Sequence, residues 1–591
     1  MCGIVGYIGK QNAKDIILSG LSRLEYRGYD SAGLAILEKN TINCYKDIGR
    51  IAHLESITQK TEPSHLGIGH TRWATHGKVT KDNAHPHISG SGRFFVVHNG
   101  VIENYKELEL TYLNDLTLKS QTDTEVLIQV IEVLTNTMSL KDALRKTLLM
   151  VKGSYAILII DKKHPDVIYA AKNKSPLLLG KSEDGFTLGS DLMALAGYAD
   201  EYYALEDEMI LEVKKAQVNA FDLDDQQKTL TYEPVVLDDF LSELGEHDHY
   251  MMKEMHEQPS VIRSIINHYY YEKTPIISDA IKNIFKESDH IYILGAGTSM
   301  HAGLSGKSIL EALIEKPVTV LNASEFAYHT PILSKKPLFI FLSQSGETAD
   351  LRACLVNIKK LNHPIITISN VKTSTLAREA NFSLEIFAGP EIAVASTKAY
   401  TAQIAVLSVL AEQVSKNVDM KQKLSRVAQA MDHALSLQDD YERLTKKLLT
   451  KRNAFYIGRL NDYTTALEAS LKLKEISYIQ TEGFAAGELK HGTIALIEEG
   501  TPVIAIISQE KIAHNTRSNL EEVASRGAHT LVIATDNVSR ETDDIILNHV
   551  DPLLTSLITV IPTQLIAYYA ALQRGYDIDK PRNLAKSVTV E

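Results

Sequence analysis

Several residue types are scarce in this chain of 591 residues, and each scarcity excludes a class of structure. There are only three cysteines, Cys2, Cys44 and Cys354, too few for a disulfide framework and without the spacing of a metal site. A reducing, cytoplasmic compartment is therefore expected. No run of about eighteen apolar residues occurs, and the N-terminal MCGIVGYIGK lacks the basic leader of a secretory signal. We therefore expect no membrane span and no membrane partner.

Positive charge is also in deficit. The chain has 62 basic and 74 acidic residues, a formal net charge of −12, which argues against a nucleic-acid partner. Apolar residues make up 44% and charged residues 23% of the chain, the composition of an ordinary globular protein. Its length exceeds what one core can hold and predicts about three or four domains.

The N-terminal part mixes strands and helices without regular alternation. Short segments rich in β-branched and aromatic residues predict strands at 2–9, 32–37, 66–72, 93–99 and 154–161. Apolar residues at three-to-four spacing predict helices at 13–26, 124–134 and 140–151. This pattern indicates an α+β domain over residues 2–214.

The sequence pattern changes after a polar, helical connection expected at 215–280. Apolar strands that end in Gly, Ser or Asn before a helix occur in HIYILGAGTS, PLFIFLSQSGET and PIITISN. This is typical of a doubly wound parallel sheet, where ligands bind at the carboxyl ends of the strands. The pattern recurs from AFYIGRLND onwards. We therefore predict two α/β domains, at 281–419 and 444–581, followed by a polar tail at 582–591.

Cys2 is the first candidate for chemistry. A mature chain that begins with cysteine carries a thiol and an α-amine on one residue, so the amine can accept the thiol proton without a separate histidine. Taken alone, Cys2 is as well explained as a small apolar residue at the start of a strand.

Four further motifs accompany Cys2, namely YRGYDSAG, GHTRWATHG, HNGVIEN and SQTDTEV. With CGIVG they resemble the glutaminase domain of the amidotransferases that have an N-terminal nucleophile. The resemblance implies that Cys2 attacks the amide of L-glutamine, while Asn99 and the N–H of Gly100 stabilise the oxyanion. It further implies that Arg72 binds the α-carboxylate, Asp123 binds the α-ammonium, and Trp73 gates an ammonia tunnel. The remaining residues of this pocket are Thr75 and His76, with Arg27 in support.

Each of these residues also has a plainer explanation. Arg72 or Asp123 could form a structural ion pair, and a lone tryptophan such as Trp73 is most often a core or interface residue. These explanations serve one residue at a time. They do not account for five motifs in order.

Two turns of the C-terminal half predict a phosphate site. GAGTS at 295–299 and SQSGET at 343–348 each follow a strand and precede a helix, where hydroxyls and free backbone N–H groups bind phosphate. Both resemble the phosphosugar isomerase (SIS) domain, which is commonly found in tandem. Relatives often have cysteine where this chain has Ala296. The matching contacts are Thr298, Ser299, Ser343, Gln344, Ser345, Thr348, Val394 and Ser396.

The segment TTALEASLKLKEISYI predicts a buried helix. Glu468, Lys472 and Glu475 recur at helical spacing and lie on one stripe of its surface. An exposed Glu–Lys ladder would give the same spacing. The other faces carry leucine and isoleucine, however, which leaves little room for a solvated side.

AAGELKHG at 485–492 and the tail NLAKSVTVE complete a resemblance that runs from Cys2 to Glu591. The chain is similar to the glutamine–fructose-6-phosphate aminotransferase family. This implies that His491 opens the ring of D-fructose 6-phosphate, Lys586 holds the ketose as a Schiff base, and Glu475 moves a proton between C1 and C2. Lys472 and Glu468 would polarise the site. The resemblance implies no cofactor or metal, a homodimer, and D-glucosamine 6-phosphate with L-glutamate as products.

Three alternatives remain open from the sequence. A different amidotransferase, such as asparagine synthetase or a phosphoribosylamine-forming enzyme, would share the N-terminal half. The SGG-x-DS pyrophosphate loop of asparagine synthetase is absent, and the acidic pair with which the phosphoribosyl enzyme binds diphosphate after a strand is not evident. A deglycase or isomerase that releases ammonia would not need the first domain. A non-catalytic sugar-phosphate sensor would not need Glu475, His491 and Lys586.

Overall fold

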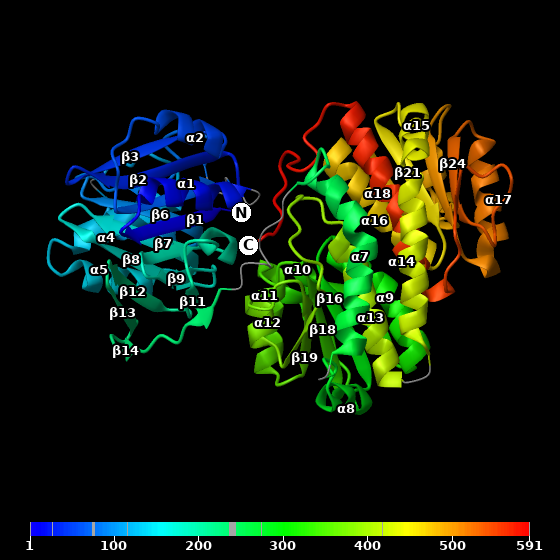
Figure 1. Cartoon of the computed structure of the whole chain (residues 1–591), viewed down its shortest axis with the longest axis horizontal. Coiled ribbons are helices and arrows are strands. Elements are labelled where there is room, and N and C mark those ends of the chain that lie inside the picture. The colour runs from blue at the N-terminus through cyan, green and yellow to red at the C-terminus, as the bar shows by residue number, and fades with distance from the viewer. Residues whose placement is uncertain are drawn as a thin grey trace. The chain divides into compact units, whose positions relative to one another are not determined.

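The computed structural model describes residues 2–25, 28–73, 77–114, 116–235, 244–272, 275–415 and 418–589. The chain divides into two compact units (Figure 1). The first comprises Met1–Leu241 together with Ala585–Glu591, and the second comprises Ser242–Leu584.

The first unit contains two largely antiparallel sheets. One has the order β15-β11-β9-β10-β1-β4-β2-β3 and the other the order β14-β13-β12-β8-β7-β6-β5. The strands of the first are β1 (Gly3–Gly9), β2 (Ser31–Glu38), β3 (Thr41–Ile48), β4 (Leu66–Arg72), β9 (Leu178–Ser182), β10 (Gly185–Gly189), β11 (Glu201–Ala204) and β15 (Glu233–Pro234). Those of the second are β5 (His87–Ile88), β6 (Phe94–Ile102), β7 (Gly153–Asp161), β8 (His164–Asn173), β12 (Met209–Lys214), β13 (Gln217–Asp222) and β14 (Gln227–Lys228).

Alternating side chains build the layers of this unit. In β6, Phe95 and Val97 pack in the core between the two sheets, with Ile4 of β1. Their neighbours Phe94 and Val96 pack under the helices on the outer face. The helices are α1 (Ala13–Arg23), α2 (Ile51–Ile57), α3 (Tyr105–Tyr112), α4 (Asp123–Leu134), α5 (Leu140–Met150) and α6 (Leu192–Leu195). Because α1 covers one sheet and α4 the other, the order is helix, sheet, sheet, helix, as the α+β prediction requires.

This unit continues beyond residue 214. Strands β13 and β14 pair onto β12 in the second sheet, and β15 pairs with β11 at the edge of the first. The two-residue strands β14 and β15 are exposed, so their sequence lacks the apolar content that marked the central strands. The strand β13 is partly buried, and its Ala220 lies in the core between the sheets.

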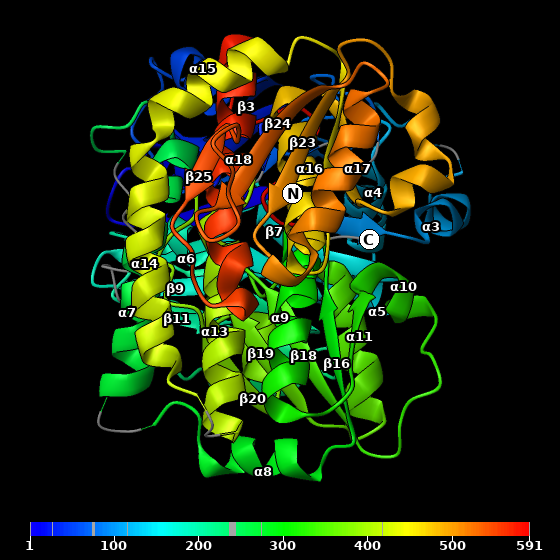
Figure 2. The ribbon, with the colours of Figure 1, turned by 90° about the vertical axis from the view of Figure 1, so that its right-hand side faces the viewer.

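The second unit contains two parallel sheets of five strands with the same topology. Their orders are β17-β16-β18-β19-β20 and β22-β21-β23-β24-β25 (Figure 2). The first is built from β16 (His290–Gly295), β17 (Val318–Asn322), β18 (Pro337–Ser343), β19 (Ile365–Ser369) and β20 (Phe382–Glu385). The second is built from β21 (Asn453–Gly458), β22 (Gln480–Ala485), β23 (Pro502–Ile507), β24 (His529–Thr535) and β25 (Ile545–Leu547). In both, the strand order reverses beside the first strand, which is where such sheets bind ligands.

The helices of this unit complete two similar α/β layers. They are α7 (Tyr250–Tyr271), α8 (Asp279–Glu287), α9 (Thr298–Ile314), α10 (Ala323–Tyr328), α11 (Ala349–Lys360), α12 (Thr375–Glu379), α13 (Lys398–Ser415), α14 (Met420–Ser436), α15 (Gln438–Leu448), α16 (Asn461–Ser477), α17 (Ala513–Ala524) and α18 (Thr555–Gln573). Short 3₁₀ helices include η3 (Glu488–His491) and η4 (Thr493–Leu496). α18 is long and apolar enough to cross a membrane by composition, but 94% of its apolar window is buried against its neighbours.

The helix α7 lies where the sequence suggested a connection between domains. Its residues Met251, Met255 and Ile262 are fully buried and join the core formed by α13, α14 and α18. Two of its polar residues, Glu254 and Gln258, are also buried and form hydrogen bonds inside the unit. The helix α7 is therefore a core helix of the second unit rather than a linker.

Candidate active sites

Cys2 lies immediately before β1 in the first unit. Its Sγ accepts a hydrogen bond from the backbone N–H of Trp73 at 3.3 Å and lies 3.4 Å from the Trp73 carbonyl oxygen. Burial raises the pKa of the Cys2 thiol, while the hydrogen bond with the Trp73 backbone and the charge of Arg72 oppose this rise. The thiol is thus held at the end of β4 and stays protonated until a base removes its proton.

Asn99 points its amide at Cys2. Its Nδ2 donates to the Cys2 carbonyl oxygen at 3.0 Å, and its Oδ1 lies 3.0 Å from Nε2 of His70. The same Nε2 contacts the His98 carbonyl oxygen at 3.0 Å. Because both contacts of Nε2 are acceptors, this nitrogen carries the proton. His70 therefore fixes the orientation in which Asn99 presents its N–H donors.

Gly100 follows Asn99 in β6 and has a φ of +138°. A Cβ there would lie 2.1 Å from the carbonyl oxygen of Ser154 on β7. Only glycine fits this conformation and spacing, so the backbone N–H of Gly100 is held beside the Asn99 amide. The two predicted oxyanion donors are adjacent and rigid.

His70 was not singled out from the sequence, and it belongs to a buried group of imidazoles. His70 stacks on His85 at 4.1 Å between ring centroids, and His85 contacts His87 edge-on at 4.7 Å. Burial lowers the pKa of His70 to about 3 and holds the pKa values of His85 and His87 well below the usual range. These rings are neutral, and they serve as hydrogen-bonding supports rather than as bases.

Replacing His70 with leucine should lower kcat for glutamine hydrolysis by about 10²-fold, the order expected when an oxyanion donor loses its alignment. The change removes the donor to Asn99 Oδ1 and leaves that amide free to rotate. KM for glutamine should change little, since Arg72 and Asp123 are untouched.

Glutaminase kinetics and a melting curve test this prediction. The control is His65→Ala, which alters an exposed histidine just before the same strand and should change neither quantity. A folded His70→Leu protein with normal kcat would contradict the positioning role.

Arg72 and Asp123 are the two residues predicted to bind the α-carboxylate and the α-ammonium of glutamine. Arg72 is only 3% exposed and ends β4, while Asp123 is 5% exposed and begins α4. Burial lowers the pKa of Arg72, and the negative charges of Asp30 and Asp123 lie close enough to oppose this. Asp123 accepts hydrogen bonds from the N–H groups of Ile102 (2.7 Å) and Thr124 (3.0 Å). The remaining predicted contacts, Arg27, Thr75 and His76, lie outside the described residues.

Trp73 follows Arg72 directly. Its indole ring meets the ring of Tyr29 edge-on, with centroids 5.7 Å apart. Its main chain contacts the Cys2 sulfur from both the N–H and the carbonyl side. A movement of Trp73 would therefore disturb the nucleophile, which links its predicted gating role to the thiol.

The second constellation lies where α9 meets α16 in the second unit. Lys472 is 1% exposed; its Nζ lies 2.6 Å from Glu475 and 3.5 Å from Glu468, and it donates to Thr298 Oγ1 at 2.9 Å. Burial opposes its charge, but Glu475 and Glu468 outweigh burial and raise the pKa of Lys472. The stripe predicted from the sequence is therefore a buried ion network and not an exposed ladder.

His301 extends this network and was not predicted. Its Nδ1 lies 2.7 Å from Glu468 Oε2, and the other carboxylate oxygen accepts from Thr298 at 3.0 Å. His301 lies three residues after Thr298 and therefore on the same face of α9. This spacing could have identified His301 as a site residue once Thr298 was a candidate. The side chains of both SIS domains meet at Glu468.

The SQSGET turn at 343–348 forms a compact loop between β18 and α11. Ser343 Oγ accepts from the N–H of Gly346 at 3.0 Å and contacts Thr348 Oγ1 at 3.1 Å. Gly346 has a φ of +66°, and a Cβ there would lie 1.9 Å from Ser374 Oγ. Beside this loop, Ser299 Oγ accepts from Gln403 at 3.0 Å. The two predicted phosphate-binding turns thus follow β16 and β18, which are neighbours in the sheet. Gln344 and Ser345 belong to the second of these turns.

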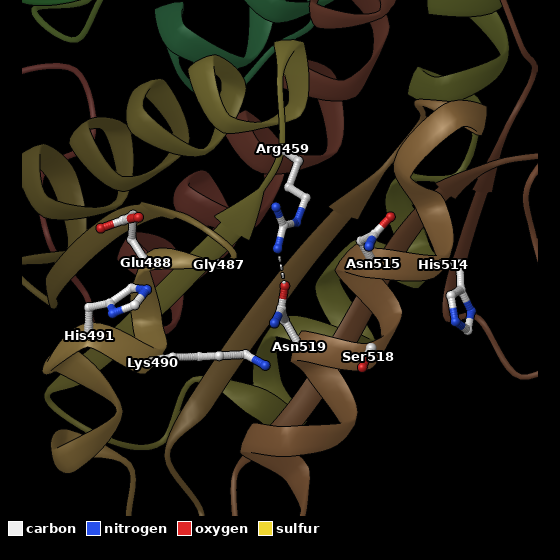
Figure 3. Close-up of a pocket in the computed structure, with 9 residues that line it drawn as sticks. All are labelled: Arg459, Gly487, Glu488, Lys490, His491, His514, Asn515, Ser518 and Asn519. Atoms are coloured by element: carbon white, nitrogen blue, oxygen red, sulfur yellow. Dashed lines mark hydrogen bonds between the residues drawn. The ribbon is translucent and has the colours of Figure 1, made fainter.

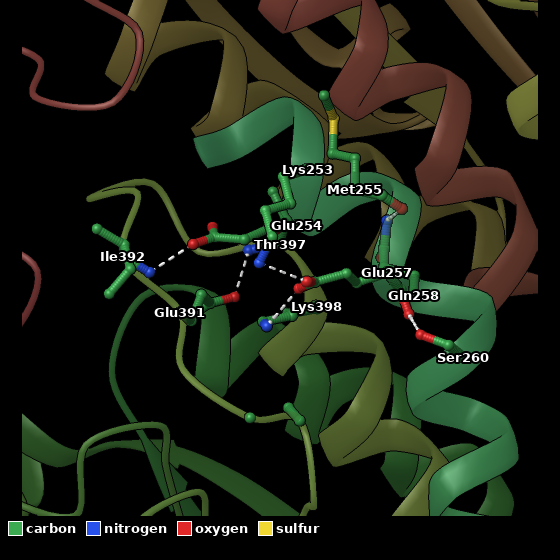
Figure 4. Close-up of polar contacts among 12 residues, drawn as sticks. Lys253, Glu254, Met255, Glu257, Gln258, Ser260, Glu391, Ile392, Thr397 and Lys398 are labelled. Atoms are coloured by element: carbon green, nitrogen blue, oxygen red, sulfur yellow. Dashed lines mark hydrogen bonds and ion pairs between the residues drawn. The ribbon is translucent and has the colours of Figure 1, made fainter. Parts of the chain in front are cut away.

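A group of buried carboxylates shapes the segment that contains Val394 and Ser396 (Figure 4). Glu391 accepts from the N–H groups of Thr397 (2.9 Å) and Ala399 (3.0 Å) and from Ser396 Oγ (2.9 Å). Glu254 of α7 accepts from the N–H of Ala393 at 3.0 Å. Glu254 thus links α7 to the segment at 391–399. This contact agrees with the place of α7 in the second unit.

His491 lies on η3 and lines a cavity of about 400 Å³ (Figure 3). The other lining residues are Arg459, Gly487, Glu488, Lys490, His514, Asn515, Ser518 and Asn519. None of the predicted phosphate contacts is among them, so the cavity is separate from the turns at 295–299 and 343–348. Lys586 lies in the final segment, which groups with the first unit. The roles of His491 and Lys586 at the sugar site therefore stay predictions.

Among the described residues, no group of three or more His, Cys, Asp or Glu side chains is placed to hold a metal ion.

Comparisons with known proteins place this chain in context. A model of the glutamine amidotransferase domain matches residues 55–229, and a model of the SIS domain matches 284–413 and 447–574. A curated glutamine–fructose-6-phosphate aminotransferase (isomerizing) of Shouchella clausii is 53% identical over 603 residues, with all of both chains covered. That of Listeria monocytogenes is 52% identical, again with all of both chains covered.

A solved structure agrees with the second unit. It is the C-terminal domain of glucosamine-fructose-6-phosphate aminotransferase from Francisella tularensis, 32% identical, with a TM-score of 0.55. The similarity covers 57% of this chain and all of the other. A putative tagatose-6-phosphate ketose/aldose isomerase from Clostridium novyi, at 19% identity and a TM-score of 0.50, shares the fold. The predicted fold, a glutaminase domain followed by two SIS domains, is confirmed.

Proposed function

The chain belongs to the glutamine–fructose-6-phosphate aminotransferase family, and we propose a division of roles among its residues for that reaction. The enzyme takes the amide nitrogen of L-glutamine, transfers it to D-fructose 6-phosphate and isomerises the product to D-glucosamine 6-phosphate. One observation supports this assignment of residues: the chain contains two separate polar sites. In one, the Cys2 residue lies beside the Asn99 amide, and in the other, buried Lys472 lies between Glu468 and Glu475.

In the mature chain, from which Met1 has been removed, Cys2 attacks the amide carbon of glutamine once its thiol proton has passed to its own α-amine. The amide N–H groups of Asn99 and the backbone N–H of Gly100 stabilise the oxyanion of the tetrahedral intermediate. Arg72 binds the α-carboxylate, because a guanidinium can hold both oxygens at once, and Asp123 binds the α-ammonium. Collapse of the intermediate releases ammonia and leaves a thioester, which water hydrolyses to glutamate.

Ammonia then reaches the sugar site within the protein. We assign the gate to Trp73, since its main chain holds the nucleophile and its stiff, broad ring can block or open a narrow passage. The supporting observation is the edge-on packing of the indole on Tyr29. Thr75, His76 and Arg27 complete the glutamine pocket in this proposal.

In the second unit, the turns at 295–299 and 343–348 bind the phosphate of the sugar. The hydroxyls of Ser299, Ser343, Ser345 and Thr348, with Gln344 and the backbone of the turn, supply the donors. Thr298 links this cradle to Lys472, and Val394 and Ser396 close its side. The phosphate thereby anchors the sugar beside α16.

The chemistry on the sugar falls to three groups. His491 moves the ring-hydroxyl proton and opens the ring, and Lys586 forms an imine with the C2 ketone, which ammonia then displaces. Glu475 carries the proton between C1 and C2 that turns the ketosimine into the aldose. Lys472 and Glu468 set the electrostatics around that carboxylate. We expect the enzyme to act as a cytoplasmic homodimer without a cofactor.

A coupled product assay tests the function. Glutamate and glucosamine 6-phosphate should form in equal amounts, and at the full rate only when both substrates are present. Glutamate without amino sugar would indicate an uncoupled glutaminase. Binding of fructose 6-phosphate with neither product would indicate a sugar-phosphate sensor.

A further inference from the structure

The two SIS domains can be matched residue by residue at their first turns. Gly297 before α9 has φ and ψ of 52° and −127°, and Leu460 before α16 has 54° and −125°. Both helices are 17 residues long and end at a left-handed residue. Because the turns follow the first strand of two sheets with the same order, Ser299 and Asp462 occupy equivalent positions.

The second turn matches in the same way. Ser343 and Gln344 at the end of β18 correspond to Ser508 and Gln509 after β23, within the similar sequences LSQS and ISQE. Ser345 then corresponds to Glu510. Where the first domain has two serines, at 299 and 345, the second has two acidic residues.

Asp462 fills the turn of its own domain. It is 0% exposed, its Oδ2 accepts from the backbone N–H of Ser508 at 2.8 Å, and its Oδ1 accepts from the Ser508 hydroxyl. The backbone N–H of Gln509 also contributes. These are the kinds of donor, a serine hydroxyl and backbone N–H groups at the end of a strand, that bind phosphate at such turns.

No ion pair to Asp462 is found among the residues that the structure describes, and burial raises its pKa to about 7. The Asp462 carboxyl is therefore held by neutral donors of the kind that bind phosphate, and not by a cation. In the first domain the equivalent side chain, Ser299, is neutral and turns its oxygen to Gln403.

We propose that the Asp462 side chain occupies the phosphate cradle of the second SIS domain and thereby confines sugar-phosphate binding to the first. Exposed Glu510 adds a negative charge at the same turn. The inference rests on the proposed phosphate site at 295–299 and 343–348. It explains why two domains of one topology provide one sugar site.

The test is a count of binding sites in the full-length enzyme. Calorimetric titration with fructose 6-phosphate, and separately with inorganic phosphate, should give one site per chain in the unaltered protein. Asp462→Ser combined with Glu510→Ser should give two, because the second cradle regains neutral donors. Glutamine hydrolysis, which occurs in the first unit, should stay unchanged. An unaltered melting curve and retained binding at the first sugar-phosphate site show that the second unit of the variant is folded.

The reciprocal exchange works in the first domain. Ser299→Asp should abolish binding of both titrants. Ser299→Asn introduces a side chain of the size of aspartate without its charge, and it should weaken fructose 6-phosphate binding by no more than about tenfold. If the paired variant does not fold, this exchange decides. A folded Asp462→Ser/Glu510→Ser protein that binds one equivalent, or a Ser299→Asp protein that still binds fructose 6-phosphate, would overturn the inference. No binding to the unaltered protein would instead refute the proposed function.

Discussion

Replacement of Cys2 by alanine should lower kcat for glutamine-dependent formation of glucosamine 6-phosphate by on the order of 10⁶-fold, the effect of deleting a covalent nucleophile in a serine protease. The Asn99 amide and the Gly100 N–H would remain, but without the sulfur there is no thioester to form. Binding of fructose 6-phosphate in the second unit should be unaffected. Product assays with glutamine as the nitrogen source provide the measurement.

The other two cysteines provide the controls for this prediction. Burial raises the pKa of Cys44 to about 11, and Cys354 is fully buried with its thiol directed at the Ala323 carbonyl oxygen. Serine at position 44 should therefore leave the rate unchanged. A glutamine-like affinity label should modify Cys2 alone, and its attachment to Cys44 or Cys354 with Cys2 intact would refute the assignment.

Replacement of Lys472 by methionine should abolish most amino-sugar synthesis and destabilise the second unit. Its ammonium is the shared partner of Glu468 and Glu475, and Glu468 is 0% exposed. Removal of one member of a buried ion network leaves uncompensated charge, at a cost of about 3–5 kcal/mol. Loss of its electrostatic contribution at the site should lower kcat by about 10²–10³-fold.

Denaturant unfolding and product assays measure the two effects of this change. The matched control is Lys474→Met, which alters an exposed lysine two residues along the same helix and should alter neither. Glutamine hydrolysis should persist in both variants. A Lys472→Met enzyme of normal stability and normal synthesis rate would show that the network is dispensable.

Much of this architecture is predictable from local patterns. The central strands of the parallel sheets are short apolar runs that end in Gly, Ser or Asn, and these were located from the sequence to within a few residues. The strands β14 and β15 were missed because a short, exposed, polar strand carries no apolar signal. The strand β13 was missed although its Val218 and Ala220 pack in the core. The candidate nucleophile Cys2 could be proposed from the sequence because the motifs that accompany it are also present.

The parts that escaped prediction depend on long-range contacts. His70 and His301 matter through single hydrogen bonds to Asn99 and Glu468, residues that are distant in sequence. No local repeat in the sequence indicates that two such residues will be in contact. Similarly, the heptad-like spacing of Glu468, Lys472 and Glu475 is shared by solvated helices. Only the packing of α16 against α9 shows that the network is buried.

The packing of α9 against α16 makes the two SIS domains mutually dependent. Thr298 and His301 of one domain bond to Glu468 of the other, and Ser305 and Ser308 meet Thr464 and Asn461 in the same crossing. The pairs are related by an approximate twofold exchange of the helices. A protein divided between the two halves would leave phosphate donors on one fragment and acid–base groups on the other. Under the proposed mechanism, neither SIS domain alone would hold a complete sugar site.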